Sequence, residues 1–140
     1  MMYSIEDLAV MTGLTDRTLR NYLKHEFLIG EKEDGKWLFT DEQVAAFLEH
    51  PAVIPALRAK RNSVVFDFLA NDKKQKEETC VILDWPEGKW KELSEFFCNA
   101  VNARNNMRMF LHNAHGNVRA ILSGETSEVL AVIEEYRTVR

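Results

Sequence analysis

The sequence predicts an α+β protein, in which three short helices and a β-hairpin precede a small ββαββα unit with an antiparallel sheet. Apolar residues recur at helical spacing through residues 3–28 and again after residue 40. Beyond residue 62, β-branched and aromatic runs alternate with turn residues, which is typical of strands. We therefore divide the chain into residues 1–56 and residues 57–140.

Residues 3–28 have the pattern of two short helices joined by a tight turn. Ala9 is small where two helices would cross, Gly13 permits a positive φ in the turn, and Leu19 returns the second helix to the core. The hydroxyls of Ser4 and Thr15 are the expected N-caps of the two helices. The remaining apolar positions of this helix-turn-helix are Ile5, Leu8, Met11 and Leu14.

Residues 29–49 predict a hairpin and a third helix. Gly30 and the pair Asp34-Gly35 separate two short extended segments, as in a β-hairpin. Thr40 and Gln43 have the spacing of a capping box at the start of the third helix. The first unit is therefore predicted to be a winged helix-turn-helix.

This order of elements resembles the N-terminal domain of the MerR-type transcription regulators. The resemblance covers roughly the first third to two-fifths of the chain. The residues that carry it are Tyr3, Ile5, Leu8, Ala9, Gly13, the run Arg17–Tyr22, Leu28 and the wing Gly35–Phe39.

The resemblance implies that the helix starting at Thr15 enters the major groove of double-stranded DNA, with Arg17 and Arg20 as the leading contacts. It implies that Tyr22 reaches a phosphate or supports the helix. In the wing, where the family often carries an Arg, Lys36 is the expected basic contact, and Trp37 is expected to share the core-facing side of the hairpin with Phe39. The full set of expected DNA-binding residues is Thr15, Arg17, Thr18, Arg20, Asn21, Tyr22, Lys24 and Lys36.

The second unit follows a connector over residues 50–62, in which Pro51 is expected to end the third helix and Pro55 to begin a short fourth one. The predicted elements beyond it are strands at 63–69, 79–83, 107–111 and 117–122, a helix at 87–104, and a final helix capped by Thr126 or Ser127.

The second unit offers few candidates for chemistry. Cys80, Cys98, His112 and His115 could in principle bind zinc, but no Cys-x-x-Cys pair is present and Cys98 lies within a predicted helix. A buried core role is the better interpretation of Cys98. We expect no metal site, no cofactor and no enzymatic activity. For the aromatic residues of this unit, a place in the core is a better interpretation than the lining of a ligand pocket.

Composition limits the classes of protein that fit. The net charge is −4, so any affinity for DNA must come from local placement of cations and not from an overall basic surface. The two cysteines do not suggest a secreted disulfide framework. No apolar run of membrane-spanning length and no signal pattern is present, which favours a cytoplasmic protein without membrane contact.

The sequence therefore predicts a transcription regulator of MerR type that binds a palindromic site as a homodimer, with residues 57–140 serving dimerisation or effector sensing. The family commonly dimerises through a long helix after the winged domain, but no long heptad run exists here. A dimer must then use another surface, such as an edge strand, the region of Leu57 or the final helix. Two alternatives stay open: an excisionase-like architectural or protein-contact module, and a sensor of a small ligand. The operator and the effector are not specified by the sequence.

Overall fold

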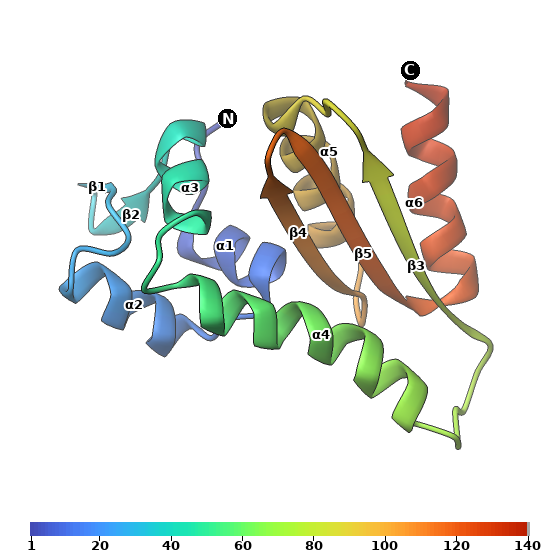
Figure 1. Ribbon diagram of the computed structural model, residues 1–140. Helices are drawn as coiled ribbons and strands as arrows, with labels where there is room; N and C mark the ends of the chain where they lie inside the picture. Colours follow the sequence, from blue (N-terminus) through green and yellow to red (C-terminus); the bar gives the residue numbers. More distant parts are fainter. Residues whose placement is uncertain (140) are drawn as a thin grey trace.

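Eleven helices and strands follow one another in the computed structural model, which describes residues 1–139. Figure 1 shows the first three helices and a hairpin on one side of the molecule, a sheet on the other side, and the long helix α4 running along both. The elements are α1 (Ile5–Thr12), α2 (Asp16–Lys24), β1 (Glu31–Glu33), β2 (Lys36–Leu38), α3 (Asp41–Leu48), α4 (Ile54–Ala70), β3 (Glu78–Trp85), α5 (Trp90–Asn102), β4 (Arg108–Ala114), β5 (Asn117–Glu125) and α6 (Thr126–Thr138).

The predicted winged helix-turn-helix is confirmed, and its helices begin at the predicted caps. Ser4 accepts a hydrogen bond from the backbone of α1 within a complete capping box, and Thr40 does the same for α3. Thr15 caps α2 by accepting from the Thr18 N–H. Gly13 ends α1 with a φ of 73°, a conformation that costs little without a Cβ. The local sequence therefore determines the geometry of the turn between α1 and α2.

The hairpin is attached to the N-terminus of the chain. Strands β1 and β2 pair antiparallel, and an additional bridge between Tyr3 and Phe39 continues the pairing beyond β2. Both side chains of this bridge are fully buried. The wing is thus held against the start of α1 by backbone hydrogen bonds and by the apolar core.

The prediction of a strand at residues 63–69 is wrong, because these residues form the C-terminal half of α4. Their β-branched and aromatic composition favours a strand locally. Leu57 and Val64 are seven residues apart, however, and both are buried, which is the spacing of one helical face. The tertiary contact of that face with the sheet overrides the local preference. The second unit is consequently βαββα, preceded by a helix, and α4 is longer than the short connector helix that Pro55 suggested.

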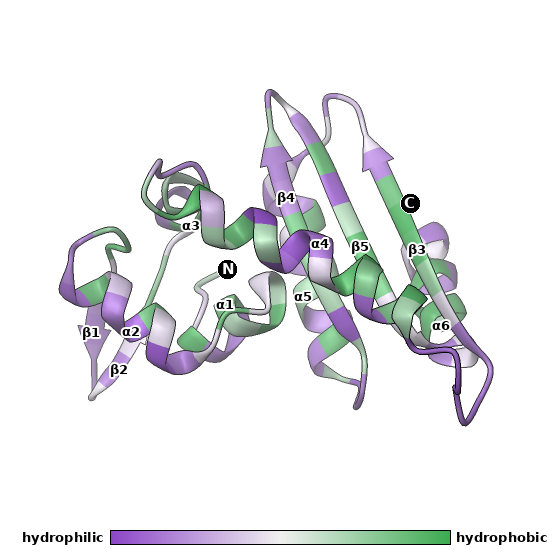
Figure 2. Cartoon of the chain, turned by 60° about the horizontal axis from the view of Figure 1, so that its bottom comes forward, coloured by the Kyte–Doolittle hydropathy of each residue, from purple (hydrophilic) through white to green (hydrophobic). Residues whose placement is uncertain are grey.

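The three-stranded sheet is antiparallel in the order β3-β5-β4. Figure 2 shows α4 crossing in front of β4 and β5, with α5 and α6 behind the sheet. Phe110 and Ile121 lie opposite each other in the register and point towards α4, while Leu111 and Ala120 point towards α5 and α6. All four side chains are buried, so the sheet contributes apolar residues to both of its faces.

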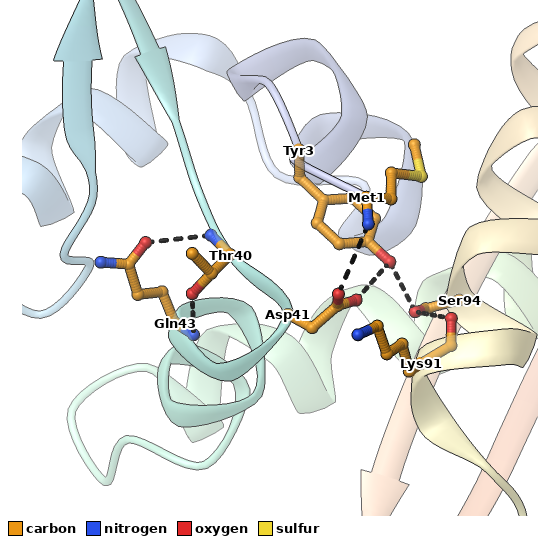
Figure 3. A network of polar contacts seen from close by, with 7 residues as sticks. All are labelled: Met1, Tyr3, Thr40, Asp41, Gln43, Lys91 and Ser94. Atoms are coloured by element: carbon orange, nitrogen blue, oxygen red, sulfur yellow. Dashed lines mark hydrogen bonds and ion pairs between the residues drawn. The ribbon is translucent and has the colours of Figure 1, made fainter.

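The winged domain and the sheet share one hydrophobic cluster, in which α1 packs against β4 and α5. Figure 3 shows the polar part of this contact: the Tyr3 hydroxyl lies between Asp41 at the start of α3 and Ser94 on α5. Asn102 on α5 also donates to Asp7 on α1 at 2.8 Å. The boundary expected at residue 56 falls in the first turn of α4, and the division into residues 1–56 and 57–140 stays a prediction.

None of the helices within residues 1–139 is both long enough and apolar enough to span a membrane.

Candidate nucleic-acid interface

Helix α2 has one buried residue, Leu19, and a largely polar exposed surface. Leu19 is fully buried and holds the helix to the core, against which Tyr22 and Leu23 also pack. The side chains of Thr18 and Tyr22 are half-buried at the margin of the exposed face. The exposed residues of α2 are Asp16, Arg17, Arg20, Asn21 and Lys24. The structure therefore brings the predicted contact residues of α2 together on one helix surface.

The N-terminus of α2 is organised by two hydroxyls. Thr15 Oγ1 accepts from the Thr18 N–H at 3.1 Å and donates to Thr18 Oγ1 at 2.9 Å. These bonds cap the first turn of α2, where the partial positive charge of the helix N-terminus would meet a phosphate. Thr15 and Thr18 therefore stabilise the N-terminus of α2, whether or not their own side chains contact DNA.

Arg20 and Asp16 form an ion pair along the exposed side of α2, with Nε and Oδ2 2.7 Å apart. Both side chains are more than half exposed, so this pair adds little to stability and can be replaced by a contact to a phosphate or a base at small cost. Among residues 1–139, neither Arg17 nor Lys24 has an ion-pair partner. The cations of α2 are therefore available to an external anion.

The Tyr22 ring belongs to the packing of the domain. Its centroid lies 5.8 Å from that of Phe47 and 6.1 Å from that of Phe27, both in tilted arrangements. Such aromatic contacts hold the ring in place. Of the two roles implied by the resemblance, the packing is consistent with support of the helix by the ring.

The wing presents a cation beside α2. Lys36 is exposed, and it lines a groove of about 330 Å³ together with Arg20, Ser4 and Trp37. The Trp37 and Phe39 rings stack with their centroids 6.5 Å apart, which confirms that they share one face of the hairpin. Two of the predicted contact residues, Arg20 from the helix and Lys36 from the wing, therefore meet at one groove.

Sequence reasoning did not single out Lys32, whose Nζ lies 5.8 Å from the centroid of the Trp37 ring. Lys32 and Trp37 are opposite each other in the hairpin register. Counting residues outward from the Asp34-Gly35 turn would have shown this pairing, because the pairs of a two-residue hairpin follow from its turn. The wing thus carries two exposed lysines, one on each strand.

Residues 3–49 match the family described as MerR HTH family regulatory protein. The N-terminal domain is a MerR HTH domain. The match ends just after α3, so no family is recognised for the part that contains α4 and the sheet. No curated protein and no solved structure shows significant similarity to this chain.

The MerR domain is a DNA-binding regulatory domain, and here it continues directly into α4. The apolar side chains Leu57 and Val64 of α4 are buried, and the helix contacts β4 and β5. This face of α4 is consequently occupied by the chain's own sheet. It is not free to form a coiled coil with a second copy.

The candidate metal ligands of the second unit are dispersed. Cys98 is fully buried on α5, which confirms its expected core role, whereas Cys80 on β3 is half-buried. His112 lies in β4 and His115 in the turn that follows. Within residues 1–139, no three His, Cys, Asp or Glu side chains are grouped in a way that could hold a metal ion.

Proposed function

We propose that this protein is a sequence-specific transcription regulator that binds a palindromic DNA site as a homodimer through its MerR domain. The observation that carries the proposal is the exposed, cation-bearing surface of α2 beside the wing, within a domain of the MerR HTH family. The proposal retains the cytoplasmic location that the sequence predicts.

The assignment of contacts follows from the geometry of this surface. Arg17, Arg20 and Asn21 have the reach and the donors to read base edges if α2 lies in the major groove. Lys24 and Lys36 are assigned to phosphates, since their ammonium groups neutralise charge without reading sequence. Lys32 joins them as a phosphate contact from the outer strand of the wing.

Dimerisation enters the proposal because one domain supplies few cations while the whole chain carries a charge of −4. Phosphate neutralisation provides much of the affinity of DNA-binding proteins, so a single copy is expected to bind weakly. Two copies related by a two-fold axis double the contacts and read a palindrome. The remaining question is which surface joins them.

We propose the free edge of β3 as that surface. The Thr126 N–H donates to the Glu77 carbonyl oxygen, and these two residues continue the β3–β5 register. Because opposed residues of an antiparallel pair alternate between bonded and non-bonded, Thr79, Val81 and Leu83 bond to β5. The N–H and C=O groups of Cys80 and Ile82 therefore point to the open edge of the sheet.

The β3 edge has the composition of a pairing strand. Residues 79–83 contain no charge and no proline, the usual protections of an edge strand, and the Ile82 side chain is 52% exposed. Antiparallel pairing of two copies about an axis at Ile82 sets Val81 opposite Leu83 of the second copy. Within the paired residues 79–85, no like charges face each other in this register. A second copy of the chain is thus the partner that fits this edge.

The DNA part of the proposal is tested by selecting fragments from a pooled genomic library and measuring affinity by fluorescence anisotropy at several salt concentrations. Arg17→Ala and Arg20→Ala should each weaken binding to the selected site by about 1–3 kcal/mol. Arg137→Ala, an exposed arginine on α6, is the matched control. Unchanged binding of both α2 variants would show that α2 is not the recognition helix.

The dimer part is tested separately by sedimentation velocity at micromolar concentration. Ile82→Lys should convert the dimer to a monomer, because a charge at the centre of the interface is not compensated. Ile29→Lys, at a residue that is 62% exposed before β1, should leave the dimer intact. A dimer that survives Ile82→Lys excludes the β3 edge, and a wild-type protein that is monomeric both free and on DNA excludes dimerisation.

An architectural or protein-contact role, as in excisionase-like proteins, remains the second candidate, and the acidic net charge favours it. The same fragment selection separates the two functions. A sequence-specific regulator enriches fragments that share a defined site. An architectural protein retains fragments without a common site, and its affinity for all of them depends on salt concentration in the same way.

A further inference from the structure

A hollow of about 300 Å³ lies where α4 crosses the sheet, next to the turn between β4 and β5. It is near the lower end of the size range of small-molecule sites. Figure 2 shows the hairpin end of β4 and β5 projecting beyond α4, away from α2 and the wing. The polar residues that line the hollow are Arg61, Asp84, His112, His115, Asn117 and Arg119.

Positive side chains outnumber negative ones around this hollow, where Arg61 and Arg119 stand against Asp84. Its only carboxylate, Asp84, is bound by two nitrogens of Arg119, at 2.7 Å from Nε and 2.9 Å from the second nitrogen. This pair holds the pKa of Asp84 below its usual range. Arg61 has no carboxylate partner among residues 1–139. The Asp84 charge is thus already compensated, while the guanidinium of Arg61 and the two histidines are left without an anion.

The side chain of His112 lies within this positive field. It is half-buried, and burial, followed by the charges of Arg61, Arg119 and Arg58, lowers its pKa. The cations come from two elements, since Arg58 and Arg61 are on α4 and Arg119 is on β5. An anion placed between them would relieve the repulsion that now disfavours protonation of His112.

We propose that this hollow binds a small oxyanion, a ligand whose phosphate or carboxylate oxygens are held by Arg61, Arg119 and His112. Arg119 presents its guanidinium in a fixed orientation because Asp84 holds it, which lowers the entropic cost of a further contact. Arg61, which lines the hollow from α4, supplies a forked donor. Asn117 and His115 at the hairpin turn can donate to the outer oxygens.

The position of the hollow connects it to the MerR domain. Lys60, the residue before Arg61 on α4, lies over the turn of the helix-turn-helix, where its Cδ would be 3.8 Å from a Cβ at Gly13. A ligand bound to Arg61 would therefore contact α4 one residue after Lys60. Lys60 is the residue that lies next to Gly13, in the turn between α1 and α2. This use as an effector site rests on the proposed function, whereas binding of the anion does not.

The binding experiment uses the histidines as reporters in proton NMR of the full-length protein. The chain has four histidines: His25, His50, His112 and His115. Titration with inorganic phosphate should shift the ring resonances of His112 and His115, raise the pKa of His112, and leave His25 and His50 unchanged. A parallel titration with malonate distinguishes phosphate ligands from carboxylate ligands. Equal small shifts of all four histidines, or none, would overturn the site.

Variants and DNA complete the test. Arg61→Gln should raise the dissociation constant for the anion roughly tenfold, as expected for loss of a charged hydrogen bond. Arg137→Gln is the matched control. A short DNA duplex that shifts His112 and His115 and is displaced by phosphate would assign the hollow to the DNA backbone and reject a small ligand. Loss of DNA binding in α2 variants leaves the phosphate titration unaffected, so the two proposals fail independently.

Discussion

The Tyr3 hydroxyl and Ser94 Oγ lie 2.7 Å apart in a buried hydrogen bond that joins the MerR domain to α5. The same hydroxyl donates to Asp41 Oδ1 at 3.0 Å, and the amino group of Met1 is 3.8 Å from the other oxygen of Asp41. Burial, together with the nearby Asp41 carboxylate, raises the pKa of Tyr3 well above its usual value. The hydroxyl therefore stays protonated and serves as the donor that compensates a buried carboxylate.

Removal of this hydroxyl is expected to destabilise the whole chain. Tyr3→Phe leaves Asp41 buried with one donor fewer, which should lower the free energy of unfolding by about 1–3 kcal/mol. Urea denaturation monitored by circular dichroism measures the change. The matched control is Tyr22→Phe, because the Tyr22 hydroxyl has no hydrogen-bond partner within residues 1–139. Equal stability of the two variants would show that the Tyr3–Asp41 bond contributes nothing.

Gly30 is expected to tolerate no side chain. A Cβ at this position would overlap the buried Phe39 ring and lie 2.8 Å from the Leu38 carbonyl oxygen. Gly30→Ala should therefore lower the free energy of unfolding by about 1–3 kcal/mol, as other overpacked sites do. Gly35→Asn is the control within the wing, since that position is open and Asn accepts a positive φ. If thermal unfolding shows no larger loss for Gly30→Ala than for Gly35→Asn, the packing of Phe39 is looser than described.

The MerR domain was predictable because its determinants are local. Ser4, Thr15 and Thr40 each cap a helix within a few residues of their own position, and Gly13 ends one. These signals need no knowledge of the rest of the chain. The exposed face of α2 follows from the same periodicity, so the candidate DNA-binding residues could be selected from the sequence.

The second unit was predicted less well because distant contacts decide it. Val64 has a β-branched side chain in a run that favours a strand, yet it is buried in a helix that crosses β4 and β5. The hollow at Arg61 escaped prediction for the same reason. Arg61 and Arg119 are far apart in sequence. The antiparallel register pairs Arg119 with His112, and the packing of α4 on the sheet brings Arg61 to them.

The thiol of Cys98 is expected to be inert in the folded protein. Burial, followed by the charge and the carbonyl of Asp7, raises the pKa of Cys98 to about 12, so little thiolate forms at neutral pH. In a Cys80→Ser background, which leaves one thiol, Ellman's reagent at pH 8 should react only after urea is added. Rapid reaction without urea would show that the contact between α1 and α5 opens readily.

The wing provides the last prediction, which separates a structural residue from a contact residue. Trp37 is half-buried and stacked on Phe39, whereas its neighbour Lys36 is exposed. Trp37→Ala should lower the free energy of unfolding by about 1–3 kcal/mol, less than the cost at a fully buried aromatic. Lys36→Ala should leave the melting temperature unchanged and reduce the salt slope of DNA binding by about one unit.

Lys32 supplies the comparison for this pair of variants, because its ammonium lies over the Trp37 ring and is also exposed. If both lysines contact phosphates, Lys32→Ala and Lys36→Ala each reduce the salt slope by about one unit, and the double variant reduces it by about two. Thermal unfolding and anisotropy measured on the same samples separate the two effects. A stable Trp37→Ala protein that no longer binds DNA would instead mean that the aromatic ring itself faces the duplex and that the lysines only flank it.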